Sequence, residues 1–391
     1  MNKELIEQAK ERFGRLIEAE AVRIAAMKET AAPNFAALDR LVIGILPGDG
    51  IGPLIMKQAL RVLRRLLDGE LAAGGIELRH IDGLDIENRA AKGQSVPDDV
   101  LAEVKKCPII LKGPMTTPRP GDPWPNLASA NAVLRRELDL FSNVRPVTVP
   151  EKGIDWTFFR ENIEGAYIWG SKGIQVNEDL AVDFVVETLQ GSRRIAGAAF
   201  EFARKNNKKS VTAVTKANIV KLTDGNFLNA CQAAAKAYPE ISYQERFVDI
   251  VSAKLGDAEF SEGLEVFVLP NLYGDIVSDV AAEIQGGVGT AGSANLGDRY
   301  ALFEAIHGTA PFLMQNNRGD YADPSSLLRA IVLMLSHIGK QEKAGLLDRA
   351  LDVCGWKERR LVITSFREDA STEAYTDYIL ETLEKLEGAG K

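Results

Sequence analysis

The chain has 391 residues, of which 46% are hydrophobic and 26% are charged, and its net charge is −8. This length is sufficient for two or three domains with a large core, and the acidic balance argues against nucleic-acid-binding and anionic-membrane-binding proteins. No apolar run is long enough to span a membrane. The three cysteines, Cys107, Cys231 and Cys354, form no CxxC pair, which indicates buried thiols in a reducing compartment.

Residues 1–30 carry apolar side chains at helical spacing, among them Phe13, Leu16 and Ile24. The segment lacks the apolar core of a secretory signal, and its many glutamates make it too acidic for a mitochondrial transit peptide. We therefore predict a cytoplasmic protein whose N-terminal amphipathic helix packs on the body of the protein or on a partner subunit.

From residue 41 onward, short β-rich runs alternate with longer helical patterns. We predict strands at 41–46, 76–80, 108–111, 211–215, 247–250, 266–269 and 361–363, and helices near 53–69, 97–106, 127–140, 179–205, 218–237, 277–285, 325–338, 342–354 and 372–387. This alternation predicts an α/β protein with helices on the faces of a sheet. Glycine and proline punctuate 113–126 and 286–298, which we expect to be long functional loops.

A glycine-rich loop, Pro47-Gly48-Asp49-Gly50-Ile51-Gly52-Pro53, follows the first predicted strand and opens a helix. Its GxGxG spacing differs from the GxGxxG pattern of dinucleotide-binding proteins. A tight strand-to-helix turn with proline at the first helical position explains the loop equally well.

Three arginines, Arg135, Arg145 and Arg160, occur close in sequence to Ser129 and Asn131. Helical spacing places Asn131 and Arg135 on one face, and Ser129 lies near the helix start, where backbone amides can bind an anion. Each arginine alone could form a surface ion pair. Together they suit a substrate with several carboxylates, because guanidinium groups bind carboxylates through two hydrogen bonds.

Five further side chains could carry proton-transfer or metal chemistry: Tyr167, Lys216, Asp249, Asp275 and Asp279. A lysine at a strand end acts as a base only if its surroundings lower its pKa. The spacing of Asp275 and Asp279 places both on one helix face, where a divalent cation would relieve their repulsion. Spacing alone, however, favours a helix N-terminal charge followed by a solvated carboxylate.

Seven segments in this order resemble the metal-dependent, decarboxylating 2-hydroxyacid dehydrogenases, the family that includes isocitrate, isopropylmalate and homoisocitrate dehydrogenases. The resemblance leaves residues 1–40 uncovered. It is carried by GILPGDGIGP (44–53), KGPMTTP (112–118), LRRELDLFSNVRPV (134–147), RENIEGAY (160–167), TKAN (215–218), NLYGDIVSD (271–279) and FEAIHGTAP (303–311).

The resemblance implies an isopropylmalate dehydrogenase-like two-domain α/β fold, which is not the Rossmann fold. Residues 41–140 and 286–391 would form a large, cofactor-side domain, residues 141–164 and 190–285 a small domain, and residues 1–40 a helical extension. A clasp at 165–189 would join two subunits into a homodimer, and a higher oligomer built from such dimers is the alternative. Lys216 and Asp249 of one subunit would then face the arginines, Asp275 and Asp279 of the other.

The resemblance also implies a role for each candidate residue. Asp249, Asp275 and Asp279 would hold Mg²⁺ or Mn²⁺, which acidifies the substrate hydroxyl and polarises the carbonyl that forms. Lys216 would relay the hydroxyl proton, and Tyr167 would protonate the enol carbon after CO₂ is lost. The substrate carboxylates would be bound by Ser129, Asn131, Arg135, Arg145 and Arg160.

The SxNxxxR pattern that begins at Ser129 is similar to that of isocitrate dehydrogenases, in which the serine and asparagine meet the γ-carboxylate. Isopropylmalate enzymes carry apolar residues there, and an isopropyl group would leave this polar pair unsatisfied. Isocitrate is therefore the expected substrate, with homoisocitrate, one methylene longer, as the nearest alternative and 3-isopropylmalate as a further one.

The resemblance implies that a nicotinamide cofactor contacts Ile51, Thr116, Thr117, His307, Gly308, Thr309, Ala310, Phe312, Leu313 and Asp323. NADP-specific bacterial relatives have Lys-Tyr where this chain has Phe312-Leu313, and Asp323 would repel a 2′-phosphate. These features favour NAD, although Arg318 and Arg367 are near enough in sequence to favour NADP instead.

Two other interpretations compete with an active NAD-dependent isocitrate dehydrogenase. A non-catalytic regulatory subunit of a heteromeric enzyme would typically lack a proton carrier or a metal-binding aspartate, and none is missing here. An unrelated α/β binding protein is disfavoured by seven motifs in family order.

Overall fold

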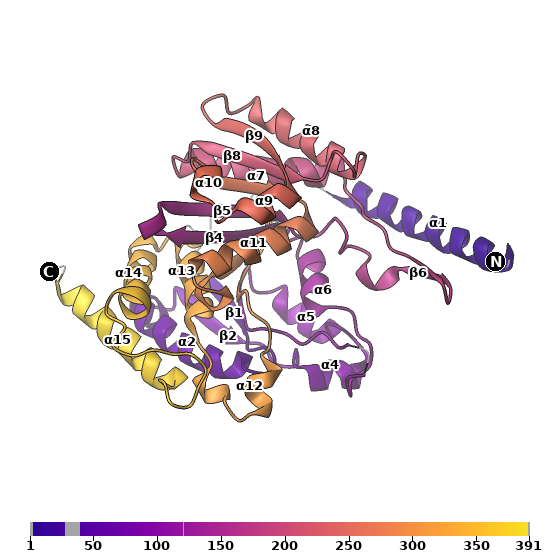
Figure 1. Ribbon diagram of the computed structural model, residues 1–391. Coiled ribbons are helices and arrows are strands. Elements are labelled where there is room, and N and C mark those ends of the chain that lie inside the picture. Colours follow the sequence, from indigo (N-terminus) through magenta and orange to yellow (C-terminus); the bar gives the residue numbers. More distant parts are fainter. Residues whose placement is uncertain (1–2, 28–39, 120, 390–391) are drawn as a thin grey trace. The chain divides into compact units, whose positions relative to one another are not determined.

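The computed structural model describes residues 3–27, 40–119 and 121–389. The chain forms two compact units, each described here by itself. The first unit comprises residues 3–27 and Phe158–Val277, and the second comprises residues 40–157 and 278–389. Strand β5 (Ile154–Glu161) and helix α11 (Asn271–Gln285) contribute residues to both (Figure 1). The domain boundaries expected from the resemblance remain a prediction.

The second unit is built on strands in the order β2-β1-β3-β12-β11-β4. Strands β2, β1, β3 and β12 are parallel, whereas β11 is antiparallel to both β12 and β4. The inner strands are almost continuously apolar, which is typical of parallel strands covered on both faces. Their bounds are β1 Leu41–Leu46, β2 Ile76–His80, β3 Ile109–Lys112, β4 Ser142–Val149, β11 Gly292–Leu296 and β12 Ala301–Ala305.

Helices flank this sheet, and α13 and α14 lie side by side (Figure 1). They are α2 Gly52–Leu66, α3 Asp68–Ala72, α4 Ile86–Lys92, α5 Asp98–Val104, α6 Ala130–Glu137, α12 Pro311–Gln315, α13 Ser325–His337, α14 Gln341–Asp352 and α15 Thr372–Ala389. Short 3₁₀ segments occupy Pro150–Lys152, Val288–Thr290 and Gly319–Tyr321, and a π-helical turn occupies Val353–Lys357.

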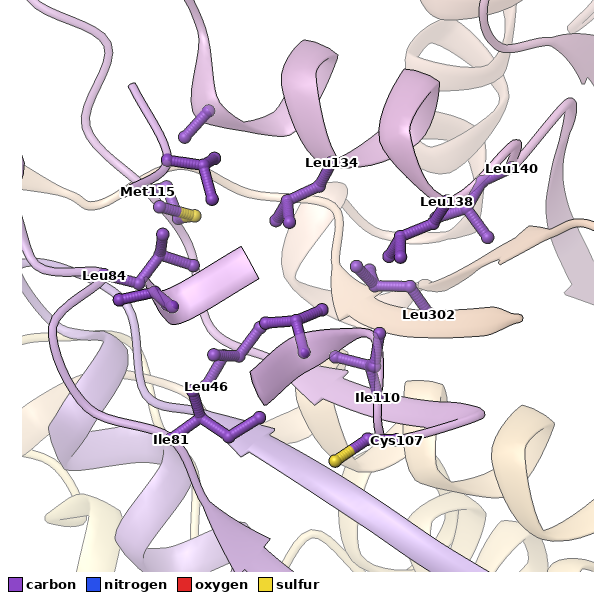
Figure 2. Packing of buried hydrophobic residues seen from close by; sticks show 14 residues of the cluster. Leu46, Ile81, Leu84, Cys107, Ile110, Met115, Leu134, Leu138, Leu140 and Leu302 are labelled. Atoms are coloured by element: carbon purple, nitrogen blue, oxygen red, sulfur yellow. The ribbon is translucent and has the colours of Figure 1, made fainter. Parts of the chain in front are cut away.

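A buried apolar cluster joins strand and helix residues on one side of this sheet. Leu46, Ile110 and Leu302 come from three strands, and Leu134 comes from α6 with Leu138 at its end. Figure 2 shows Leu138 facing Leu302 across this layer. The cluster fixes α6, which carries several of the predicted substrate-binding residues.

The first unit contains strands in the order β5-β10-β8-β9, with β10, β8 and β9 parallel, and a separate antiparallel pair β6-β7. Its strands besides β5 are β6 Ile174–Asn177, β7 Leu180–Val182, β8 Ser210–Thr215, β9 Ser242–Phe247 and β10 Val266–Leu269. Its helices besides α11 are α1 Lys3–Ala26, α7 Leu189–Lys205, α8 Thr223–Ala235, α9 Val248–Lys254 and α10 Ala258–Ser261, with a 3₁₀ segment at Gly170–Lys172.

The α/β class is confirmed, but several predicted elements are wrong. Residues 248–250 begin helix α9 rather than ending a strand, and 361–363 form no strand. The predicted helix 179–205 starts only at Leu189, after β7, where Thr188 caps its N-terminus. The predicted helix 277–285 begins earlier, at Asn271, and part of the predicted loop 286–298 is strand β11. Among the described residues, no helix has the length and hydropathy required to cross a membrane.

Candidate active site

Three loops of the second unit converge behind the carboxyl ends of β1, β3 and β12. The Asp49 amide donates to the Pro114 carbonyl at 2.7 Å, and the Ile51 amide donates to the Thr309 carbonyl at 3.2 Å. A Cβ atom at Gly113 would lie 1.9 Å from the Pro47 carbonyl oxygen, so only glycine permits this approach. The structure thus brings together Ile51, the 113–117 loop and the 307–310 loop, and these contain most of the predicted cofactor contacts, including Thr116 and Thr117.

Asp49 ties these loops together, a role that the sequence did not indicate. Its carboxylate accepts hydrogen bonds from the amides of Ile86 at 2.8 Å and Thr116 at 2.7 Å. Its Oδ2 also lies 3.5 Å from Nη1 of Arg89, which is fully buried and donates to the Ser95 and Thr116 carbonyls. Burial lowers the pKa of Arg89, and the charge of Asp49 opposes this effect.

The 307–323 segment has features that fit a bound ligand. Nε2 of His307 is buried and has no hydrogen-bond partner among the described residues, and a buried polar atom of this kind ordinarily has one. Ala310 adopts the left-handed conformation, with φ of 48°, immediately before α12. Oδ1 of Asp323 accepts a hydrogen bond from the Ser325 amide at 2.8 Å, and burial raises the pKa of Asp323.

Of the two cations that the sequence suggested, Arg318 belongs to this segment and Arg367 contacts it. The Arg318 guanidinium is 5.4 Å from the ring centre of Phe312 and 4.4 Å from that of Phe366. Arg367 donates to the Asn316 and Asn317 carbonyls at 3.3 and 3.1 Å. A cation therefore lies beside Phe312, because the chain folds Arg318 back against that ring.

Helix α6 carries the predicted γ-carboxylate residues. Ser129 caps the helix, its Oγ accepting from the Ala132 amide at 3.4 Å. Asn131 and Arg135 lie one turn apart, and the buried Asn131 Oδ1 has no hydrogen-bond partner among the described residues. An unsatisfied buried amide next to an arginine suits a polar ligand.

Arg135 is held by Glu304, a buried carboxylate in β12 that the sequence analysis overlooked. Glu304 forms an ion pair of 2.7 Å with buried Lys112 and one of 3.4 Å with Arg135, and it accepts from Asn295 at 2.8 Å. Burial alone would raise the pKa of Glu304, but the charges of Lys112 and Arg135 lower it to about 2. A glutamate inside the apolar strand sequence ALFEA was the signal available.

Arg145 and Arg160 each bond a predicted metal-binding aspartate. In the second unit, Nη1 of buried Arg145 donates to Asp279 Oδ1 at 2.7 Å and to Ser278 Oγ at 2.8 Å. In the first unit, buried Arg160 forms a short ion pair with Asp275.

Asn271 and Tyr167 complete the surroundings of the Arg160–Asp275 pair. Nε and Nη2 of Arg160 donate to Asn271 Oδ1 at 3.0 and 2.8 Å. The Tyr167 hydroxyl donates to Asp275 Oδ2 at 3.0 Å, and its ring centre lies 5.6 Å from the Arg160 guanidinium.

Lys216 and Asp249 form a third pair, in the first unit. Nζ of Lys216, just beyond β8, lies 2.7 Å from Oδ1 of Asp249 in the first turn of α9. The hydrogen bond from Lys216 lowers the pKa of Asp249, whose side chain is 63% exposed. Among the described residues of one chain, no three acidic, histidine or cysteine side chains are grouped to hold a metal.

Comparison with known proteins identifies the family. Residues 42–377 match the family described as isocitrate/isopropylmalate dehydrogenase. The NADP isocitrate dehydrogenase of Rickettsia prowazekii is 38% identical over 325 residues, which are 81% of this chain and 62% of that protein. This chain thus spans less than two thirds of that relative's length.

Other relatives are covered more fully. Homoisocitrate dehydrogenase of Methanocaldococcus jannaschii is 32% identical over 87% of this chain and 97% of its own. The human mitochondrial NAD isocitrate dehydrogenase subunit alpha is 35% identical, over 79% and 81%. The crystal structure of isocitrate dehydrogenase from Methylococcus capsulatus superposes with a TM-score of 0.76 at 32% identity, covering 88% and 99% of the two chains. The predicted fold is thereby confirmed, and the chain belongs to the isocitrate/isopropylmalate dehydrogenase family of decarboxylating dehydrogenases.

Proposed function

We propose that this chain catalyses the metal-dependent oxidative decarboxylation of isocitrate to 2-oxoglutarate with reduction of NAD. The observation that carries the proposal is that cationic side chains are paired with carboxylates, and that binding of substrate and metal ion would give these groups new partners. Arg145 bonds Asp279, Arg160 bonds Asp275, and Lys216 bonds Asp249. A substrate with several carboxylates and a divalent cation together supply a new partner for both members of each arginine–aspartate pair.

The carboxylate set fits a hard divalent cation, which prefers oxygen ligands. Asp275 and Asp279 of one subunit, with Asp249 of the partner subunit in a homodimer, would hold Mg²⁺ or Mn²⁺. The bound ion would lower the pKa of the substrate hydroxyl and stabilise the negative charge that develops on that oxygen. Arg135, Arg145 and Arg160 would orient the substrate through its carboxylates.

Two side chains of the first unit would move the protons. Lys216 would take the hydroxyl proton as hydride leaves for the nicotinamide ring. After CO₂ departs, the Tyr167 hydroxyl would donate its proton to the enol carbon, a role supported by its partial exposure and its bond to Asp275. Both groups can act as general acid or base when held within hydrogen-bond reach of the reacting atom.

Ser129 and Asn131 would select the substrate. The unpartnered Oδ1 of Asn131 is an acceptor, so the amide would turn its NH₂ donor towards a carboxylate of the ligand. An isopropyl group would leave that amide without a partner, at a cost of about 1–3 kcal/mol, and would offer no acceptor to the Ser129 hydroxyl proton. Isocitrate is favoured over 3-isopropylmalate for this reason, and homoisocitrate remains the nearest alternative because its terminal group is also a carboxylate.

The cofactor would lie along Ile51, Thr116, Thr117 and the 307–310 loop, reaching Phe312, Leu313 and Asp323. The orphaned Nε2 of His307 supports a ligand there. NAD is favoured because Phe312 and Leu313 offer no hydrogen bonds to a phosphate and Asp323 lies nearby in sequence. NADP is the second candidate, and the guanidinium of Arg318 beside Phe312 is the observation that favours it.

Initial rates on the purified chain with Mn²⁺ test the proposal. Isocitrate, homoisocitrate and 3-isopropylmalate are each assayed with NAD and with NADP, following reduced nicotinamide by absorbance. The expected result is highest kcat/KM for isocitrate with NAD. Preference for 3-isopropylmalate would refute the role of Ser129 and Asn131, and a large NADP preference lost in R318M would assign the 2′-phosphate to Arg318. Isocitrate binding without turnover would instead indicate a regulatory subunit.

A further inference from the structure

The N-terminal helix α1 packs against the segment that carries Tyr167. Leu16 is buried with Ile168 and Trp169, and Phe184 packs against the same cluster. The rings of Phe13 and Phe184 stack with their centres 4.9 Å apart. Helix α1 lies entirely outside residues 42–377, the part of the chain that matches the family. The contact is therefore an addition to the shared fold.

Two polar contacts in the same interface fix the position of α1. Nη2 of Arg23 donates to Oε1 of Glu164 at 2.8 Å, and Glu164 is 2% exposed at its side chain. Glu20 accepts from Nε of Arg23 at 2.8 Å and from the indole nitrogen of Trp169 at 3.0 Å. Removing one partner of such a buried ion pair is strongly unfavourable, because the other charge then stays buried without compensation.

These contacts lie on both sides of Tyr167 in the sequence. Glu164 precedes Tyr167 by three residues and Trp169 follows it by two. Glu164 also accepts from the amide and hydroxyl of Thr188, both at 2.7 Å, while its backbone carbonyl accepts from Asn271 at 2.8 Å. Arg23 is thus bonded to Glu164, the carboxylate that anchors the start of the Tyr167 segment.

Two further buried acids, Glu161 and Glu187, lie near the Arg23–Glu164 ion pair. The Glu161 carboxylate accepts from the amides of Asn162, Ile163 and Glu164 at 2.9–3.0 Å. Burial, followed by the charges of Glu161 and Glu164, raises the pKa of Glu187 well above its usual value. Burial raises the pKa of Glu161 and the charge of Arg194 opposes this effect, whereas Arg23 is ion-paired with Glu164 itself. Without Arg23, Glu164 would keep its hydrogen bonds to Thr188 but would lose this ion pair.

We propose that Arg23 is a positioning residue for Tyr167, so that α1 holds the Tyr167 hydroxyl against Asp275 by binding the segment before and after it. This inference rests on the proposed function, which gives Tyr167 the task of protonating the enol carbon. A proton donor displaced by about 1 Å can lose up to about 100-fold in rate. Arg135 and Arg145 lie on other elements, and Arg160 in β5 keeps its own bonds to Asp275 and Asn271, so substrate affinity should change little.

The test compares R23M with R23K and R15M in the full-length chain. Arg15 lies on the same helix and pairs with Glu11 at 3.1 Å, with both side chains mostly exposed. R15M therefore removes an arginine from α1 without touching the Tyr167 segment. We expect R23M to lower kcat about tenfold or more with KM for isocitrate within about threefold, R23K to recover most of kcat, and R15M to match the wild type.

Two further readouts separate positioning from simple loss of structure. Deprotonation of C3 of 2-oxoglutarate reverses the proposed Tyr167 step, so exchange of these protons in D₂O, followed by NMR, should slow in R23M as much as kcat does. The ¹⁹F signal of Trp169 in protein labelled with 5-fluorotryptophan, assigned with W169F, reports the docking of α1 without any turnover. If R23M does not fold, E20Q must show the same selective loss.

The outcomes distinguish the two proposals. A wild-type chain with no isocitrate turnover overturns the proposed function, while the Trp169 signal still reports whether Arg23 docks α1. An R23M chain with a shifted Trp169 signal but unchanged kcat and exchange rate makes α1 a stabilising extension only, and overturns the positioning role. Unchanged values of all three measurements in R23M overturn the inference at its first step.

Discussion

Replacing Glu304 by glutamine should destabilise the second unit more than any exposed charge change. The side chain is 9% exposed and lies between buried Lys112 and half-buried Arg135. A pKa of about 2, in place of the ordinary 4.5, corresponds to about 3 kcal/mol of stability. Because the folded pKa is depressed, this contribution is complete above pH 4.5 and is lost as the pH falls towards 2.

The E304Q variant removes this contribution at neutral pH and leaves Lys112 buried without its anion. A loss of about 3–5 kcal/mol is expected, measured as the free energy of unfolding in urea at pH 7. Protein concentration is held constant, because subunit association would shift the transition. The matched control is E103Q, which breaks an exposed pair with Lys106 and should cost less than about 1 kcal/mol.

Two further measurements sharpen this prediction. The E304Q/K112M double variant removes both charges, so it should recover much of the lost stability. The difference between wild type and E304Q should also shrink as the pH falls below 4.5, because the Glu304 carboxylate of the unfolded chain takes up a proton there while the folded one stays charged until about pH 2. An E304Q loss below about 1 kcal/mol at pH 7, or a difference independent of pH, would refute the reasoning.

Three other substitutions test different parts of the chain. D49N should lower stability by about 2–4 kcal/mol, because it removes the carboxylate that is ion-paired with buried Arg89; a melting temperature equal to wild type would contradict this. Burial, followed by the charge of Glu161, raises the pKa of Glu187, so stability is lost as the pH rises through the folded pKa. E187Q should therefore raise the melting temperature more at pH 8 than at pH 5, and equal shifts would argue against it. N131L should reduce kcat/KM for isocitrate by about 100-fold, and unchanged initial rates would remove Asn131 from the substrate site.

The apolar core was predictable because central parallel strands are apolar along their whole length. Val266–Leu269 is buried throughout and Leu41–Leu46 is buried except at Val42, and both strands were located correctly from sequence. Strand β9, Ser242–Phe247, lies at the end of the strand order, and none of its residues is fully buried. It therefore has no apolar run to reveal it, and the adjacent apolar residues of α9 were taken for the strand instead.

The candidate residues were predictable as chemical types, but their partners were not. Spacing placed Asn131 and Arg135 on one helix face, whereas nothing in that spacing indicates Glu304, which is distant in sequence. Arg318 illustrates the same limit, since its approach to Phe312 and Phe366 depends on how two loops fold back. Motif spacing is local information, and ion pairs between distant segments are set by the tertiary fold.

Helix α1 shows how a polar pair inside an apolar face determines where that face docks. The predicted amphipathic helix is confirmed, and it packs on its own chain rather than being free for a partner along its whole length. Hydrophobic spacing accounts for Leu16, yet Ile17 and Ile24 remain exposed, so apolar burial alone would allow several rotations of the helix. Glu20 and Arg23 select one rotation of the helix, in which Arg23 bonds Glu164 and Glu20 bonds Trp169. Any other rotation would leave buried charges unpaired.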